Sequence, residues 1–168
     1  LTNSERQEVE RNILEKAEEA LKGTDWNSVK ALVLAGEDWH PGVIGIVASR
    51  LVERYHRPTV LISLRDGVGK GSCRSIPGFD MYDGLRRCAD LLVQFGGHHQ
   101  AAGLSLLEEN IPAFAERLNT VAGEILNDDD LNEIYQEFCE LNQRKLNELY
   151  VVISFENIQD KLTASTDK

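Results

Sequence analysis

The sequence has few cysteines, which stabilise many exported proteins as disulfides, and no long apolar run, which would anchor a membrane protein. Its three cysteines, Cys73, Cys88 and Cys139, are widely spaced and form no Cys-x-x-Cys pair, which argues against a disulfide framework and a thiolate zinc site. No apolar run approaches the roughly 18 residues that a membrane-spanning helix needs, and residues 1–10 are too polar for a signal peptide. We therefore expect a cytoplasmic protein with no membrane partner.

Metal-binding motifs are also lacking. The sequence contains no Asp-His-His, His-x-Asp or His-x-x-x-His cluster, whereas hydrolysis by two metal ions needs several carboxylates and histidines that converge. The acidic run at 128–130 is typical of a helix start rather than of a metal site. The sequence thus predicts neither a catalytic centre nor a bound cofactor in this chain.

Charge is unevenly distributed along the chain. The net charge of −10 opposes binding to a phosphate backbone. Residues 39–103, however, carry 8 basic and 5 acidic side chains, a net charge of +3, and contain all four histidines. Because the groups that attract anions gather in this middle segment, any nucleic-acid contact is expected there, and the acidic ends are expected to be solvated helix faces.

Apolar periodicity predicts alternating helices and strands, and hence an α/β fold with a mixed central sheet flanked by helices. The Asp66-Gly67 dipeptide predicts a hairpin between two of the strands. Ser4 is the expected cap of a first helix that ends near Gly23, and because the chain begins with Leu1 in a helical pattern, we expect the natural polypeptide to extend upstream. Helices are expected at 4–21, from Pro41, at 81–93, 111–126 and 131–150, and strands at 30–35, 59–64, 68–76, 102–106 and 151–155.

Two adjacent glycines precede two histidines in the segment 96–103. Gly96 and Gly97 allow backbone angles that other residues avoid, and they would let a phosphate or sugar approach the main-chain amides. His98 is then placed to donate to a phosphate oxygen. The alternative is a glycine-rich turn between a helix and a strand, with surface histidines.

A second candidate lies on the strand expected at 68–76. Because side chains alternate along a strand, Lys70, Ser72 and Arg74 share one face and present an ammonium, a hydroxyl and a guanidinium in a row. This set suits a phosphodiester backbone, since Arg binds phosphate through two hydrogen bonds and Ser adds a neutral donor. The alternative is an edge strand that its charges keep soluble.

A third candidate is the start of the helix expected from Pro41. His40 precedes that helix, and the N-terminus of a helix favours anions. His40 would therefore face a substrate or, alternatively, cap the helix. Arg86 and Arg87 are expected on a solvated helix face.

Three segments together resemble a known family. WHPGVIGIVASRLVERYHRPTVLIS (39–63), GVGKGSCRSIPGFDMYDGL (67–85) and LLVQFGGHHQAAGLS (91–105) are similar, in this order, to the DHHA1 domain of RecJ-type exonucleases of the DHH phosphoesterase superfamily. The resemblance covers residues 1–126. It implies a 5′-to-3′ exonuclease specific for single-stranded DNA, in which this domain grips the DNA.

The resemblance also implies roles for particular residues. Gly96, Gly97 and His98 match the family's substrate-binding loop, Ser72 and Arg74 match positions expected to hold DNA phosphates, and His40 falls in a segment that faces the cleft. Manganese or magnesium ions are expected in an upstream DHH domain of the same polypeptide, so the isolated chain is expected to be inactive. Residues 1–23 would be the connecting helix, 24–127 the DHHA1 domain and 128–168 an acidic helical tail.

Two other functions remain open at this point. One is a DHH-family nano-RNase or phosphoadenosine phosphatase, which acts on short oligonucleotides or a small nucleotide. The other is a stand-alone nucleic-acid-binding module. The long segment at 36–51 favours the exonuclease over the first alternative.

Overall fold

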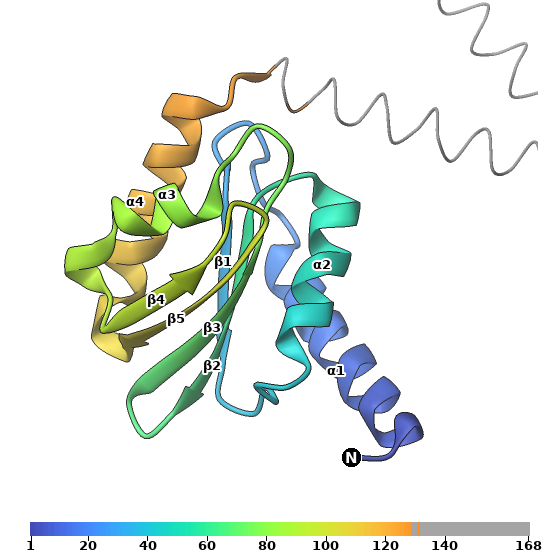
Figure 1. Ribbon diagram of the computed structural model, residues 1–168. Helices are drawn as coiled ribbons and strands as arrows, with labels where there is room; N and C mark the ends of the chain where they lie inside the picture. The colour runs from blue at the N-terminus through green and yellow to red at the C-terminus, as the bar shows by residue number, and fades with distance from the viewer. Residues whose placement is uncertain (129–130, 132–168) are drawn as a thin grey trace, which may run out of the picture. The chain divides into compact units, whose positions relative to one another are not determined.

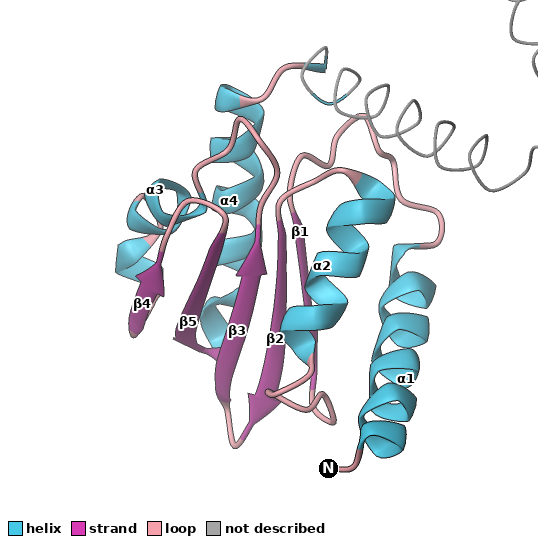
Figure 2. Cartoon of the chain, turned by 45° about the vertical axis from the view of Figure 1, so that its right-hand side comes forward, coloured by secondary structure: helices cyan, strands magenta, loops and turns pink. Residues whose placement is uncertain are grey.

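Five strands form one mixed sheet with helices on both of its faces (Figures 1 and 2). The computed structural model describes residues 1–128 and residue 131. The predicted α/β class is confirmed. The strands are β1 (Leu32–Gly36), β2 (Thr59–Arg65), β3 (Val68–Arg74), β4 (Gln94–Gly97) and β5 (Ala101–Leu107). The helices are α1 (Asn3–Leu21), α2 (Ile44–Tyr55), α3 (Met81–Arg86) and α4 (Ile111–Ile125), with the short 3-10 helices η1 (Ala89–Leu91) and η2 (Glu108–Asn110).

The sheet has the strand order β1-β2-β3-β5-β4. β1 and β2 are parallel because α2 carries the chain back between them, and the other neighbouring strands are antiparallel. Asp66 and Gly67 both have positive φ, 52° and 76°, as a tight turn that matches the strand twist requires. The predicted hairpin is therefore confirmed, and β1 and β4 are the outer strands of the sheet.

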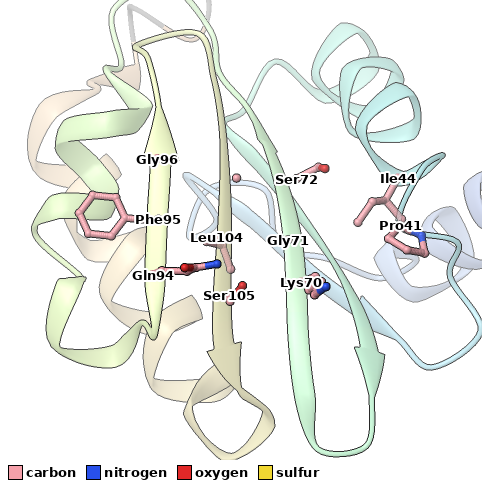
Figure 3. Close-up of a pocket in the computed structure, with 11 residues that line it drawn as sticks. Pro41, Ile44, Lys70, Gly71, Ser72, Gln94, Phe95, Gly96, Leu104 and Ser105 are labelled. Atoms are coloured by element: carbon pink, nitrogen blue, oxygen red, sulfur yellow. The ribbon is translucent and has the colours of Figure 1, made fainter.

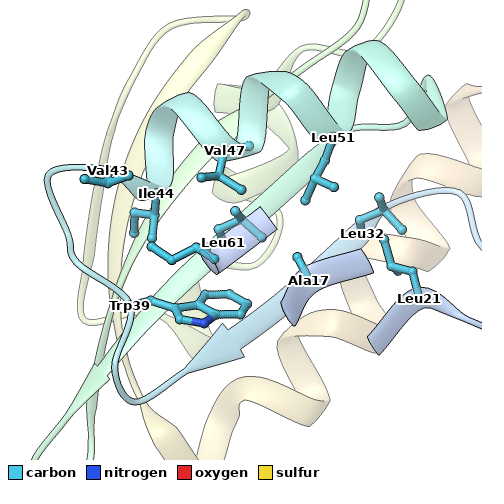
Figure 4. Close-up of a cluster of buried hydrophobic side chains, with 11 residues drawn as sticks. Ala17, Leu21, Leu32, Trp39, Val43, Ile44, Val47, Leu51 and Leu61 are labelled. Atoms are coloured by element: carbon cyan, nitrogen blue, oxygen red, sulfur yellow. The ribbon is translucent and has the colours of Figure 1, made fainter. Parts of the chain in front are cut away.

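One core lies between the sheet and the helices α1 and α2 (Figure 4). Leu61 of β2 is fully buried under α2, and the Ser63 hydroxyl donates to the Trp39 carbonyl oxygen at 2.6 Å. This contact holds the segment before α2 against β2. The buried members of this core are Ile13, Ala17, Leu21, Leu32, Trp39, Val43, Ile44, Val47, Ala48, Leu51 and Leu61.

The first helix begins at Asn3, and its cap lies two residues before the expected cap, Ser4. Thr2 caps it: the Thr2 hydroxyl accepts the Glu5 N–H at 3.2 Å, and the Glu5 carboxylate accepts the Thr2 N–H at 2.8 Å. This reciprocal pair satisfies two backbone donors that the first turn would otherwise leave free. Arg50 of α2 binds Glu10 of α1 at 2.5 Å, which links the two helices beside their shared apolar core.

The opposite face of the sheet packs against α3 and α4 (Figure 2). Asn119 ties α4 to the start of β1, because its Oδ1 accepts the N–H groups of Lys30 (2.6 Å) and Ala31 (3.1 Å). Its Nδ2 donates to the Ser28 carbonyl oxygen at 3.0 Å. Since α3 and α4 cover this face, the sheet surface left open lies on the side of α2, beyond the strands that α2 covers.

The helix expected at 81–93 is shorter in the structure. α3 ends at Arg86, η1 follows, and the chain is extended from Leu92. The Val93 N–H donates to the Ser105 carbonyl oxygen at 2.8 Å, so pairing with β5 begins where helix was predicted. The β-branched and aromatic residues at 93–95 favour strand, and the apolar spacing alone does not reveal this.

The helix expected from Pro41 begins three residues later, at Ile44. Pro41, Gly42 and Val43 form a turn in which the N–H groups of Val43 and Ile44 both donate to the His40 carbonyl oxygen, at 3.0 and 3.2 Å. Gly42 therefore lies outside the helix, and only Gly45 lies in its first turn.

The predicted helix at 131–150 and strand at 151–155 lie outside the described residues, apart from Leu131, which is buried. The domain boundaries expected after residues 23 and 127 stay predictions. Among the described residues, no helix combines the length and the apolar character needed to cross a membrane.

Candidate functional site

The three polar side chains of β3 share one face, as the alternation predicts. Lys70, Ser72 and Arg74 pair in register with Ser63, Leu61 and Thr59 of β2, and Leu61 packs under α2. These side chains therefore point to the α2 side of the sheet. The intervening Gly69, Gly71 and Cys73 face the α4 side, where burial raises the pKa of the Cys73 thiol to about 12. At neutral pH Cys73 is a protonated core residue rather than a nucleophile.

Arg74 lies beside the first turn of α2. Its Nη1 donates to the Cys73 carbonyl oxygen at 2.8 Å. A Cβ at Gly45 would lie 2.7 Å from Nη2 of Arg74 and 3.6 Å from Oγ of Ser72. The missing side chain at Gly45 thus makes room for the guanidinium against the helix. No carboxylate in the described part of the chain forms an ion pair with Arg74 or Lys70, so both charges are available to an anion.

A groove of about 570 Å³ crosses the sheet from the start of α2 to β4 (Figure 3). Pro41 and Ile44 stand on its α2 side, and in Figure 3 Gln94 of β4 points toward Ser105 of β5. The lining consists of Pro41, Ile44, Lys70, Gly71, Ser72, Gln94, Phe95, Gly96, Gly103, Leu104 and Ser105. The groove therefore joins two of the predicted phosphate ligands to the glycine segment.

Two glycines, Gly96 of β4 and Gly103 of β5, leave the floor of this groove without side chains. Gly96 and Gly103 are paired across β4 and β5. A Cβ at Gly96 would have no atom within 4 Å, and one at Gly103 would meet only the Gly71 carbonyl oxygen, at 3.7 Å. Both positions thus have room for a side chain in the fold, yet they leave the backbone open to a ligand.

Gly96 and Gly97 lie in a strand, and the prediction of a loop at these glycines is wrong. They are the last two residues of β4, and Gly97 pairs with Ala102. The φ of Gly97 is +136°, and a Cβ there would lie 2.5 Å from the Ala101 carbonyl oxygen. Gly97 is therefore required by the hairpin that joins β4 to β5.

His98 begins the turn of that hairpin, outside the residues that line the groove. Its N–H donates to the Ala101 carbonyl oxygen at 2.9 Å, and its Nδ1 accepts the Gln100 N–H at 3.3 Å. The turn is anchored, because the His99 carbonyl oxygen accepts the Met81 N–H at 2.9 Å. The exposed imidazole of His98 thus has a fixed position at the end of β4.

His40 is exposed in the turn before α2. Its Nδ1 accepts the Gly42 N–H at 2.9 Å, so the side chain caps its own turn, which is the structural role that the sequence left open. His40 adjoins Pro41 of the groove but does not line the groove itself.

Two polar residues of the groove, Gln94 and Ser105, are not among the residues predicted from the sequence. They are partners across β4 and β5, on the same face as Lys70. The alternation of buried and open residues along β5 marks Gly103 and Ser105 as one face, and this pattern was a usable signal. Among the described residues, no group of three or more His, Cys, Asp or Glu side chains could hold a metal ion.

Known proteins resemble this chain over the same region. A family model described as the DHHA1 domain matches residues 28–124. The chain is 40% identical over 130 residues to the single-stranded-DNA-specific exonuclease RecJ of Bacillus subtilis, covering 76% of this chain and 16% of that protein. It is 41% identical over 118 residues to the Escherichia coli protein of the same name, covering 67% of this chain and 19% of that protein.

Two solved structures share the fold. One is RecJ from Thermus thermophilus in complex with Mg²⁺, with a TM-score of 0.65 and 37% identity, covering 74% of this chain and 19% of that one. The other is exonuclease RecJ bound to manganese, with a TM-score of 0.63 and 40% identity, covering 71% of this chain and 29% of that one. The chain thus spans less than a third of each of these four relatives.

Proposed function

The chain belongs to the DHHA1 domain family, and on that premise we propose that it is the substrate-binding domain of a RecJ-type 5′-to-3′ exonuclease, in which it holds the phosphates of single-stranded DNA. The observation that carries this proposal is the β3 face, where Lys70, Ser72 and Arg74 line up with no carboxylate among the described residues to neutralise the cations. The RecJ names of the relatives favour this function over a nano-RNase or phosphoadenosine phosphatase.

Each of the three side chains contributes a different interaction with a phosphate. Arg74 presents a planar set of donors that matches two oxygens of one phosphate, and Lys70 supplies a compact charge. Ser72 adds a neutral donor between them. Alternate side chains along a β-strand lie about 7 Å apart. Lys70, Ser72 and Arg74 can therefore contact successive phosphates of a single DNA strand.

The absence of side chains at Gly96 and Gly103 leaves room in the groove for one strand of DNA. With no side chains at Gly96 and Gly103, sugars and bases can lie directly on β4 and β5 while the phosphates face β3. In a duplex the second strand would occupy that space. The proposed selectivity is therefore steric, and it rests on the glycines rather than on the charges.

We propose that the metal ions of such an exonuclease are bound outside this chain. The described residues do not fit a metal site, because no three of their His, Cys, Asp or Glu side chains converge. We propose that the manganese or magnesium ions lie in the DHH domain of the same enzyme, and that this chain positions the phosphodiester for hydrolysis there. On this proposal the isolated chain binds DNA without cutting it.

Binding of a labelled oligothymidylate by the purified chain tests the proposal. Two neutralised phosphates predict a slope of about −1.4 for the logarithm of affinity against the logarithm of salt concentration. Affinity should therefore fall about sevenfold between about 50 and 200 mM salt, as measured by fluorescence anisotropy. A duplex of the same length is the control and should bind more weakly. Equal affinity for the duplex, or tight binding that salt does not change, would contradict the proposal.

A further inference from the structure

A row of polar side chains crosses the open face of the sheet beside Gly96 and Gly103. Gln94 of β4 pairs in register with Ser105 of β5, and Ser105 pairs with Lys70 of β3. The three side chains therefore lie on one face of the sheet, and all three residues line the groove. Because hydrogen-bonded strands lie about 4.8 Å apart, the Cα atoms of Gln94 and Lys70 are about 10 Å apart. The row thus spans the width of the groove.

The amide of Gln94 and the hydroxyl of Ser105 are available to a ligand. Within residues 1–128 and 131, neither of these side-chain groups has a hydrogen-bond partner. Gln94 is exposed and Ser105 is partly buried, and the Gln94 side chain points toward Ser105 (Figure 3). Each of the two groups can both donate and accept a hydrogen bond. The described part of the fold does not use this capacity.

The chemistry of the row changes from β3 to β4. Lys70 is cationic and suits a phosphate, whereas Ser105 and Gln94 are neutral and suit uncharged polar groups. In a nucleotide the base is the part farthest from the phosphate, and the sugar lies between them. A nucleotide whose phosphate contacts β3 can therefore lie with its sugar on β5 and its base on β4, where Gly96 and Gly103 leave room. One edge of that base then lies beside Gln94.

We infer that Gln94 and Ser105 bind the edge of a nucleobase in the groove and accept every base. The inference rests on the proposed function, because it needs a single strand whose phosphates lie on β3. Each DNA base has a donor beside an acceptor on its Watson–Crick edge, and this edge is free in a single strand. A carboxamide also has a donor beside an acceptor, and it matches either order of the two by turning over. Gln94 thus adds affinity without sequence specificity, which suits an exonuclease that must accept every sequence.

The test compares Gln94→Ala with Gln7→Ala in the full chain. Gln7 is an exposed glutamine of α1 that does not line the groove, so its replacement is the matched control. Single-stranded oligomers of thymidylate, deoxyadenylate and deoxycytidylate, each about eight nucleotides long, are the probes for fluorescence anisotropy. We expect Gln94→Ala to weaken binding of all three at least about fivefold, because the hydrogen bonds to a base edge are lost. Gln7→Ala should bind like the wild type.

A probe whose bases cannot form hydrogen bonds separates contacts with the base from contacts with the DNA backbone. In this probe every thymine is replaced by difluorotoluene, which keeps the shape of thymine but lacks its carbonyl oxygens and its N–H group. The wild type and Gln94→Ala should bind this probe equally. The salt slope for oligothymidylate should be unchanged in Gln94→Ala, whereas Arg74→Ala should reduce its magnitude by about 0.7, the contribution of one phosphate on a single strand. Melting temperatures show whether each variant keeps its fold.

The possible failures are distinguishable. If Gln94→Ala binds every probe like the wild type while Arg74→Ala binds weakly, the base site is wrong and the proposed function stands. If neither substitution changes binding, the proposed function fails and the inference fails with it. A loss that is as large on the difluorotoluene probe as on oligothymidylate places Gln94 against the sugar or the phosphate and overturns the inference. A loss confined to one of the three homopolymers makes the site sequence-specific and also overturns it.

Discussion

Replacing Arg74 with alanine should weaken binding of single-stranded DNA about ten- to a hundredfold. A charge-assisted hydrogen bond contributes about 1.5 to 3 kcal/mol, and Arg74 has no carboxylate partner among the described residues to compete with a phosphate. The free energy of unfolding should change by less than about 0.5 kcal/mol, because the side chain is only partly buried and the only hydrogen bond that it makes among the described residues is the one to the Cys73 carbonyl oxygen.

Arg117→Ala is the matched control for this substitution. Arg117 lies on α4, on the opposite face of the sheet, and pairs with the exposed Asp90. Removing it deletes the same charge from the chain but leaves the groove intact, so it should bind like the wild type. Fluorescence anisotropy measures the DNA affinity of both variants, and thermal melting shows whether either variant has lost stability. If Arg74→Ala binds DNA as the wild type does, or simply unfolds earlier, β3 carries its charges for solubility and not for phosphate binding.

Replacing Gly97 with alanine should destabilise the fold by about 2 to 4 kcal/mol, the largest change in stability that we expect. Its φ of +136° is a conformation that almost only glycine adopts. The added methyl would also lie 2.5 Å from the Ala101 carbonyl oxygen and from the Ala102 Cα, so the backbone of the hairpin would have to shift. The melting temperature should fall by about 10 °C.

Gly96→Ala separates stability from binding at the adjacent position. A methyl at Gly96 meets no atom within 4 Å, so this variant should melt like the wild type. It would raise the groove floor, and we therefore expect weaker binding of single-stranded DNA. Denaturant unfolding should thus show a loss of stability for Gly97→Ala but not for Gly96→Ala, and anisotropy should show that Gly96→Ala binds more weakly although it stays folded. Equal stability of Gly97→Ala and the wild type would mean that the β4–β5 hairpin has another geometry.

Much of this fold is predictable from local patterns. The Asp66-Gly67 hairpin and the shared face of Lys70, Ser72 and Arg74 follow from turn chemistry and from the period of two along a strand. The helices that bury one apolar stripe, α1, α2 and α4, were likewise predicted close to their observed limits. These features depend on residues that are neighbours in the sequence, so local sequence patterns are enough to predict them.

The groove depends on long-range pairing that local patterns do not contain. Glycine has no side chain to mark a period, so the sequence predicts a loop at Gly96 and Gly97, whereas they are the last two residues of β4. Gln94 lies beside Ser105 through the register of β4 on β5, and Gly45 of α2 makes room for Arg74 of β3. Each of these contacts joins elements that are brought together by folding.

The backbone amides that respond to DNA identify the surface of the domain that binds it. A ¹⁵N-labelled chain is titrated with a short oligothymidylate, and the chemical-shift changes are followed amide by amide. We expect the largest changes along the groove, at Gly71, Ser72, Gly96, Gly103 and Ser105, with little change on α4. Changes that concentrate on α4 or on the outer face of α1, with the groove amides unmoved, would contradict it.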